Sequence, residues 1–259
     1  MQLQFYFRCM IDIYYPYFHQ ASVWNELQYS LRSLEANLQE DFRVWIVGDR
    51  PSWITGIHFI PHRRCEGIKE NQTFDAITKL MLFCEHPGTH PFFIRMYDDI
   101  YLLEPVTVAE IGKFKAMYDW HGVNHYNYDT WYQQLIRTMA AVMHKGYHGW
   151  NTETHFPELF NKELMLAIIG EYRALENRYL TSTLYHNMLF PDITPEIFKK
   201  DYGIQFFNNQ DFQFYTSSEG DLQAKCAGKK YLVHNDGGLN ENLKRFLEQK
   251  FSNKSRFEI

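Results

Sequence analysis

The chain has 259 residues, of which 45% are hydrophobic and 22% are charged, a composition typical of folded globular proteins and not of disordered or fibrous ones. The formal net charge is -5, so the chain as a whole lacks the basic character expected of a nucleic-acid-binding protein. No apolar run approaches the roughly 20 residues that span a bilayer, and the first residues lack the pattern of a secretory signal, so we expect no membrane span and a cytoplasmic location.

The first hundred residues alternate between strand and helix patterns. A nearly continuous run of β-branched and aromatic residues from Leu3 to Tyr15 predicts a buried first strand, which Arg8 and Asp12 interrupt. A helix of about four turns follows, with Ser22 as a candidate cap. The elements expected after it are strands over 42–47, 57–60 and 92–96, and a helix with apolar residues at Phe74, Ile77, Leu80, Met81 and Cys84.

The second part of the chain has a mixed pattern, and no clear linker separates it from the first. We expect helices over 131–145, 158–177 and 239–251, and extended segments over 205–215 and 231–233. The fold class predicted is α/β, with a Rossmann-like, mixed but mainly parallel sheet flanked by helices, whose ligands gather at the carboxyl ends of the strands. One domain over 1–259 is preferred, with 1–105 as a nucleotide-binding half.

Two adjacent carboxylates end the apolar strand Phe92–Met96. Asp98 and Asp99 would repel each other at a buried strand end, and a hard divalent cation such as Mg²⁺ or Mn²⁺ offsets that repulsion while accepting oxygen ligands. Such an ion neutralises charge on a leaving diphosphate. The alternative is a solvated turn, in which Asp is common.

Several segments in the same order along the chain resemble Stealth-type proteins and related bacterial and phage glycosyltransferases of the GT-A fold. The helix 25–35 is similar to a family helix with the pattern SLRS, and Gly48-Asp49-Arg50-Pro51-Ser52-Trp53 is similar to the turn after the family's second strand. Tyr97-Asp98-Asp99 matches an Asn-Asp-Asp metal segment with Tyr in place of Asn. The remaining matches are Thr154-His155-Phe156-Pro157, Val233-His234-Asn235-Asp236 and the segment 251–258, in which Asn253 replaces a Pro.

The resemblance implies a GT-A-like glycosyltransferase with a nucleotide-sugar donor, such as a UDP-sugar, bound in residues 1–105 and an acceptor half over 106–259. Donor-binding residues would be Arg8, Asp49, Lys79 and Asp98. Metal ligands for Mn²⁺ or Mg²⁺ would be Asp99, His234 and Asp236.

Each of these residues also has a structural alternative. Asp49 and Asp236 suit turns. Arg8 could pair with a carboxylate, Lys79 could extend to water, and His234 could be structural. An inverting enzyme needs a base, for which His155, Glu153 and Asp211 are the candidates, while a retaining enzyme need show none.

The acceptor is the least defined part of this hypothesis, and either a glycan or a modified DNA base would serve. A group of ring side chains is a candidate acceptor wall, although half of it could be core: Trp120, His121, His125, Tyr126, Tyr128, Trp131 and Tyr132. Two other functions remain open. One is a Stealth-like transferase that moves a sugar phosphate, and the other is a catalytically silent sugar- or nucleotide-binding module.

Overall fold

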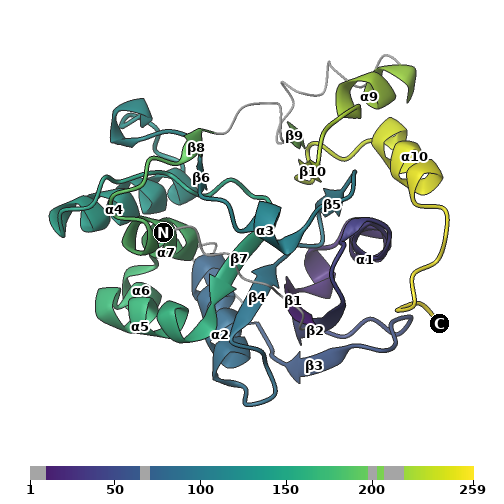
Figure 1. Ribbon diagram of the computed structural model, residues 1–259, viewed down its shortest axis with the longest axis horizontal. Helices are drawn as coiled ribbons and strands as arrows, with labels where there is room; N and C mark the ends of the chain where they lie inside the picture. The colour runs from purple at the N-terminus through teal and green to yellow at the C-terminus, as the bar shows by residue number, and fades with distance from the viewer. Residues whose placement is uncertain (1–9, 65–70, 198–202, 207–218) are drawn as a thin grey trace.

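The computed structural model describes residues 10–64, 71–197, 203–206 and 219–259, and its centre is a five-stranded sheet (Figure 1). The strand order is β3-β2-β1-β4-β7. The strands are β1 (Ile11–Tyr17), β2 (Phe42–Gly48), β3 (His58–Pro61), β4 (Phe92–Arg95) and β7 (Glu158–Asn161). The first four are parallel and β7 runs antiparallel to β4. The predicted mixed, mainly parallel α/β fold is therefore confirmed.

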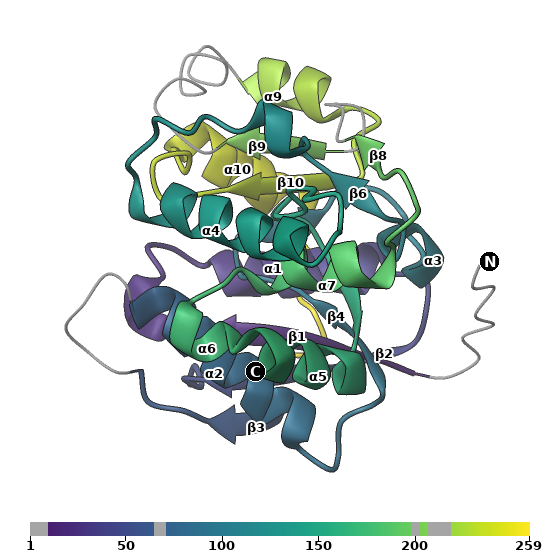
Figure 2. The ribbon, with the colours of Figure 1, turned by 90° about the vertical axis from the view of Figure 1, so that its left-hand side faces the viewer.

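Helices cover both faces of this sheet (Figure 2). Alternate residues of β1 face opposite sides, because side chains in a strand alternate. Ile13 and Tyr15 pack in one core cluster with Leu31 of α1 (Glu26–Asn37), and Tyr14 packs in another with Phe83. The helices over this second face are α2 (Asn71–Glu85), α5 (Lys162–Tyr172), α6 (Ala174–Asn177) and α7 (Thr181–Leu189).

A second sheet has the strand order β5-β10-β9 and begins shortly after the carboxyl end of β4. It consists of β5 (Ile100–Leu102), β10 (Tyr231–His234) and β9 (Gly203–Phe206), and a core cluster joins it to α9 (Glu219–Cys226) and α10 (Glu241–Lys250). Because β5 begins directly after Asp98 and Asp99, the two carboxylates lie in the turn where the chain leaves one sheet and enters the next.

The remaining elements lie outside the two sheets described above. They are α3 (Val108–Ile111), α4 (Thr130–His144), the short pair β6 (Lys115–Ala116) and β8 (Glu196–Ile197), and 3-10 turns at His19–Ala21 and Trp120–Gly122. Among the residues described, no helix is both long enough and apolar enough to cross a membrane.

The structure corrects three local predictions. The segment 158–177 begins as strand β7 and only then becomes helical, since Glu158–Asn161 pairs with β4. Ser22 does not cap α1 directly; its hydroxyl donates to Glu26, whose carboxylate accepts the backbone N–H groups of Val23 and Trp24. Helix α7 was not predicted. The expected strand residues 3–9 and the extended segment 207–215 lie outside the described residues.

A buried ion pair aligns the two central strands. Asp12, which is 0% exposed, pairs with Arg43, its register partner on β2. The other oxygen of Asp12 accepts from the backbone N–H of His90, and Arg43 donates to the carbonyl of Gly88 at 2.7 Å. The charge of Asp12 is thus balanced inside the sheet, as a buried carboxylate requires.

The last residues form a strap over α1 and the loop after β2. Glu258 accepts from Arg32 of α1 through two parallel hydrogen bonds of 2.7 Å. Phe257 is 2% exposed in the core, and its carbonyl accepts from the backbone of Thr55. The side chains that the resemblance singled out at 251–258 therefore have a structural role in this chain.

Candidate functional site

A cavity of about 830 Å³ opens where β1 and β4 end. The chain builds β1, β2 and β3 outward on one side and then returns to place β4 on the other side of β1, so the order reverses between β1 and β4. In open α/β sheets this reversal point is where ligands bind. The cavity walls come from Tyr14, Pro16, Gln72, Thr73, Ala76, Ile77, Leu80, Arg95, Tyr97, Asp99, Asn127, Asp129, Trp131, Tyr132, Glu153, His155, Tyr179, Leu180, Thr181 and Asn235.

Asp99 and His155 meet on the cavity wall. The Nε2 atom of His155 lies 3.2 and 3.3 Å from the two carboxylate oxygens of Asp99. The ring of Tyr97 stacks on the imidazole, with centroids 5.0 Å apart and planes 5° from parallel. Burial lowers the pKa of His155, but the neighbouring Asp99 outweighs burial and the net pKa is raised. The two residues form an oriented imidazole–carboxylate pair.

The backbone of His155 is in a conformation that few residues other than glycine adopt. Its φ is 55°, in the left-handed region. Phe156, 2% exposed, packs against Tyr231, and the carbonyl of Thr154 accepts from Gln205 at 2.6 Å. These anchors hold the imidazole in place at a local energetic cost, and such strain is common at functional sites.

Arg95, at the end of β4, lies behind this pair. Its guanidinium is buried, donates to Glu158, Ser182 and Thr181, and lies 5.4 Å from the ring centroid of Tyr97. Ser182 in turn donates to Glu158 at 2.8 Å. This arrangement connects the cavity wall to the N-terminus of α7.

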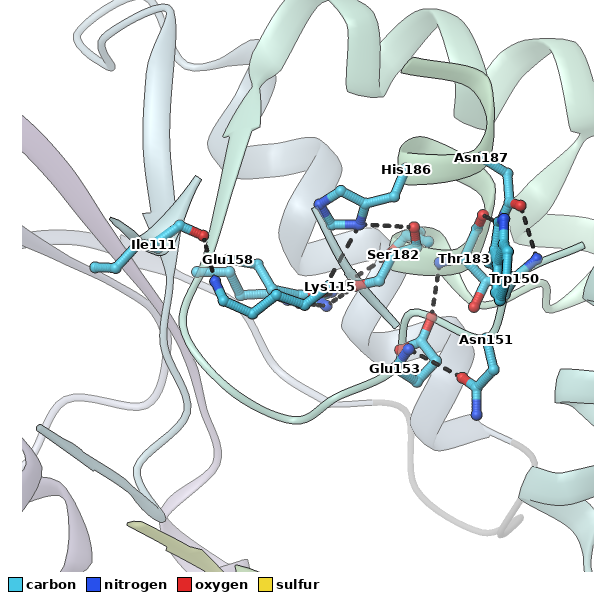
Figure 3. A network of polar contacts seen from close by, with 12 residues as sticks. Ile111, Lys115, Trp150, Asn151, Glu153, Glu158, Ser182, Thr183, His186 and Asn187 are labelled. Carbon is cyan, nitrogen blue, oxygen red and sulfur yellow. Dashed lines mark hydrogen bonds and ion pairs between the residues drawn. The ribbon is translucent and has the colours of Figure 1, made fainter. Parts of the chain in front are cut away.

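The polar network continues away from the cavity (Figure 3). Nδ1 of His186 lies 3.1 Å from the carbonyl of Ser182 and 3.9 Å from Glu158. Lys115 donates to the carbonyls of Glu110 and Ile111, and burial lowers its pKa to about 8. The network fixes the rear of the site, because a buried charge stays only where other groups satisfy it.

Glu153 contributes a second carboxylate to the cavity. Its Oε1 atom accepts from the backbone N–H of Thr183 at 2.9 Å, and its own N–H donates to Asn151 (Figure 3). It thereby caps α7, whose N-cap Leu180 supplies no side-chain hydrogen bond. Burial raises the pKa of Glu153, although Arg95 opposes this shift. A buried carboxyl with a raised pKa is a candidate proton acceptor.

A second cavity of about 500 Å³ lies at the ends of β1, β2 and β3. Asp49 contributes to its wall and accepts from the backbone N–H of His19 at 2.9 Å. The guanidinium of Arg64 lies 4.7 Å from the ring centroid of Phe18. Gly48 has a φ of 128°, and an added Cβ would stand 2.0 Å from the carbonyl oxygen of Tyr17. Only glycine therefore allows this turn to approach β1. The lining residues are Phe18, Gln20, Gly48, Asp49, Pro61, His62, Arg63 and Arg64.

Three of the predicted residues are not among those that line either cavity. Lys79 is 2% exposed, forms an ion pair with Asp75 at 2.9 Å and donates to the carbonyl of Tyr17 at 3.1 Å. His234 is 1% exposed: its Nε2 lies 3.0 Å from the hydroxyl of Tyr101 and its Nδ1 3.1 Å from the carbonyl of Asn235. Asp236 is exposed in the turn after β10.

Asp98 is next to the first cavity but does not line it. Burial and then the neighbouring Asp99 raise its pKa to about 7. Arg8 and Asp211 are outside the described residues. The candidates that share the first cavity are thus Asp99, Glu153 and His155, while Asp49 lines the second.

The predicted metal ligands do not come together as a set. Across the described residues, no group of three or more His, Cys, Asp or Glu side chains has metal-ligand geometry. Both ring nitrogens of His234 contact protein groups, and Asp236 is exposed. The adjacent carboxylates fit a cation better: Asp99 faces the cavity, and Asp98 carries the raised pKa of a crowded carboxyl. Of the three predicted ligands, Asp99 is the one that lines the first cavity.

Sequence reasoning missed Arg95 and Thr181 on the cavity wall. Arg95 had a detectable signal, because a cation in the buried strand 92–96 needs an anionic partner, the same argument that drew attention to Arg8. Thr181 had none. It reaches the cavity because β7 reverses direction and brings α7 back toward β4.

The aromatic group expected as an acceptor wall divides in two. Trp120 and Tyr132 pack against a core cluster of Val123, Leu135, Met139 and Leu180. Tyr126, Tyr128 and Trp131 are exposed, and Trp131 and Tyr132 line the first cavity.

Comparisons with known proteins found similar solved structures but no similar sequence family. No family model matches the chain, and no curated protein does. The structure is similar to that of an active-site mutant of LgtC, with 12% identity, a TM-score of 0.49, and coverage of 93% of this chain and 96% of that one. It is also similar to the galactosyltransferase LgtC in complex with donor and acceptor sugar analogues, with 13% identity, a TM-score of 0.48 and the same coverage of 93% and 96%.

Proposed function

We propose that the chain is a glycosyltransferase that moves a sugar from a nucleotide-sugar donor, such as a UDP-sugar, to a hydroxyl group of an acceptor. The observation that carries the proposal is the meeting of Asp99, His155 and Glu153 on one cavity at the point where the strand order reverses. A cavity of about 830 Å³ has room for the transferred sugar and an acceptor unit together.

The nucleoside part of the donor is proposed to occupy the second cavity. Pro16 and Phe18, two residues apart at the end of β1, line the first and the second cavity respectively. Asp49 offers a carboxylate to a base or ribose donor, and Arg64, whose guanidinium lies over the ring of Phe18, offers a cation to a phosphate. A donor that extends along this edge would present its sugar in the first cavity.

Glu153 is proposed as the group that accepts the proton of the acceptor hydroxyl. Its carboxylate has a fixed orientation, because the backbone of Thr183 holds one oxygen. Its raised pKa also favours proton uptake. His155, paired with Asp99, would stand beside the leaving diphosphate and donate a hydrogen bond to it.

A divalent cation belongs to the proposal through Asp99. When bound, Mn²⁺ or Mg²⁺ would neutralise charge on the leaving nucleoside diphosphate. The chain's own residues supply the orientation: Tyr97 stacks on His155, and His155 holds the carboxylate of Asp99.

The test is release of nucleoside diphosphate from a panel of nucleotide sugars. We expect turnover with at least one donor and loss of it in Asp99→Asn, while Asp192→Asn, which alters an exposed carboxylate that lines neither cavity, serves as the matched control. Donor binding without turnover by any acceptor mixture or by water would instead identify a silent binding module.

The nucleotide product also distinguishes the proposed sugar transfer from the transfer of a sugar phosphate. Transfer of a sugar from a UDP-sugar releases UDP, whereas transfer of a sugar phosphate releases UMP and leaves a phosphodiester in the product. Chromatography of the nucleotides and mass spectrometry of the product distinguish the two reactions. Exclusive release of UMP would contradict the proposal.

A further inference from the structure

Three exposed rings belong to one short segment, 126–131, which contributes to the wall of the first cavity. Tyr126 is 84% exposed, Tyr128 is 83% exposed and Trp131 is 44% exposed. Of the Phe, Tyr and Trp side chains that the structure describes, these three are the exposed ones. Exposed aromatic surface that gathers in one short segment marks a binding site more often than a scattered apolar residue does.

The segment that carries these rings has a defined backbone. The N–H of Tyr126 donates to the side chain of Asn124, and the N–H of Asp129 donates to that of Asn127. Asp129 then caps α4 by accepting from the N–H groups of Trp131 and Tyr132. These local hydrogen bonds fix the backbone that carries the rings, which lowers the entropic cost of ordering the segment on binding.

The rings are continuous with the cavity. Asn127, Asp129, Trp131 and Tyr132 line its wall, so Tyr126 and Tyr128 alternate in sequence with cavity-lining residues. Across the same space, α2 contributes the neutral polar side chains of Gln72 and Thr73. A ligand bound to the rings would therefore extend directly into the space that holds Glu153.

The charge of this surface selects the kind of ligand. The segment 116–136 contains Asp119 and Asp129 but no Lys or Arg. Proteins that stack nucleic-acid bases on aromatic rings also need cations for the phosphates, and this segment supplies no Lys or Arg. Neutral sugars need no cations, because their hydrogen-bearing ring faces pack on aromatic rings and their hydroxyls bond to amide and hydroxyl side chains.

We infer that Tyr126, Tyr128 and Trp131 form an acceptor subsite for a neutral oligosaccharide, whose terminal unit enters the cavity. This inference rests on the proposed glycosyltransferase function and specifies its acceptor class. It places a chain of sugar units, and not a polyanion, on the aromatic rim.

Binding without donor tests the inference separately from turnover. The wild-type chain is applied to an array of neutral oligosaccharides that includes hexamers of glucose, mannose, galactose and N-acetylglucosamine, with oligothymidylate and polysialic acid as anionic probes. Calorimetry then measures the dissociation constant of the best binder. We expect Tyr126→Ala/Tyr128→Ala to raise that constant at least tenfold, because two stacking faces are lost.

Two controls accompany the double variant. Tyr126→Phe/Tyr128→Phe keeps both ring faces and should bind within about threefold of wild type. Val23→Ala, which alters a residue that is 56% exposed and lines neither cavity, should bind as wild type does.

Binding of none of the neutral oligosaccharides, or binding that the alanine variant retains, would overturn the inference. So would binding of oligothymidylate that depends on the two tyrosines, which would indicate a nucleic-acid acceptor. Donor turnover by the wild-type chain, measured in parallel, shows whether the proposed function survives such a result.

Discussion

His155 contacts both carboxylate oxygens of Asp99, a residue 56 positions earlier in the chain, with N···O distances of 3.2 and 3.3 Å. The two side chains reach each other at one end of a strand pair in the central sheet, because Asp99 follows β4 and His155 precedes β7, which pairs with β4 in the antiparallel direction. The pair therefore exists only when the antiparallel strand is in place.

We predict that Asp99→Asn abolishes turnover and leaves the fold intact. The substitution removes charge from a crowded pair of carboxylates, which favours the folded state, and it weakens a partly exposed contact with His155 that contributes about 0–1 kcal/mol. Thermal unfolding should thus change by no more than a few degrees. Activity near the wild-type value, or an unfolded variant, would show that Asp99 is structural.

His155 can be tested with two substitutions that separate its side chain from its backbone. Both His155→Ala and His155→Gly should lower kcat by roughly 10²–10³-fold, the range for loss of one hydrogen-bond donor to the charge that develops in the transition state. Glycine accepts a φ of 55°, so the Gly variant should be more stable than the Ala variant by about 1 kcal/mol. Turnover that returns with glycine would mean that the imidazole only supports the loop.

The proton-accepting role of Glu153 predicts a change in the pH profile. Glu153→Gln keeps an oxygen for the N–H of Thr183, so the cap on α7 and the melting temperature should be retained. It removes the base, so kcat should fall about 10²–10⁴-fold. In wild type, kcat should decline as pH falls through the raised pKa of Glu153, and this acidic limb should be missing from the variant. An unchanged acidic limb would assign the base elsewhere.

The donor and the cation are predicted to bind together. The carboxylate of Asp99 and a diphosphate are both anionic, so the diphosphate should bind poorly without a cation between them. Calorimetry should show UDP binding at least tenfold tighter with Mn²⁺ than with EDTA. Equal affinity in the two conditions would remove the metal from the proposal.

The contact between Arg32 and Glu258 predicts sensitivity to acid. Burial raises the pKa of Glu258, but the hydrogen bonds from Arg32 and Gln28 outweigh this and lower the pKa to about 2. A lowered carboxyl pKa stabilises the fold above the unfolded value of 4.5, and the contribution is lost as pH falls from there toward 2.

Glu258→Gln should therefore cost about 3 kcal/mol near neutral pH and make the unfolding midpoint less dependent on pH below 4.5. Glu241→Gln is the matched control, because that carboxylate lies at the surface beside Lys244. Urea unfolding measured at several pH values checks both. Equal pH dependence in the wild type and Glu258→Gln would contradict the assignment.

Hydrophobic periodicity predicted the elements whose apolar residues recur at regular spacing within their own sequence. Strand β2 and helices α1 and α2 carry apolar residues at regular spacing, and they form close to where the pattern places them. The segment 158–161 was wrongly expected to be helical, because its strand character comes from pairing with β4, about 66 residues away in the chain, and not from its own sequence. Pairing between strands that are far apart in the chain cannot be detected from a short stretch of sequence.

The sequence named some of the residues that line the first cavity, but not how every side chain is placed. Asp99 and His155 were found from a strand-end carboxylate pair and a motif resemblance, and they meet. His234 was expected as a ligand from the family resemblance, and in the structure its side chain is buried with Nε2 beside the hydroxyl of Tyr101. Which face a strand residue presents depends on which sheet receives it, and sequence spacing does not specify this.

The ion pair between Asp12 and Arg43 has a consequence for the far edge of the sheet. If β1 slipped by one residue along β2, Asp12 would lose its register partner and lie uncompensated among apolar side chains, which costs several kcal/mol. The same slip would move Pro16 and Phe18 by about 3.3 Å and turn them to the opposite faces. A mispairing at the amino end of the strands would thus displace residues that line both cavities. The buried carboxylate of Asp12 therefore fixes the strand register on which the site depends, although it lines neither cavity.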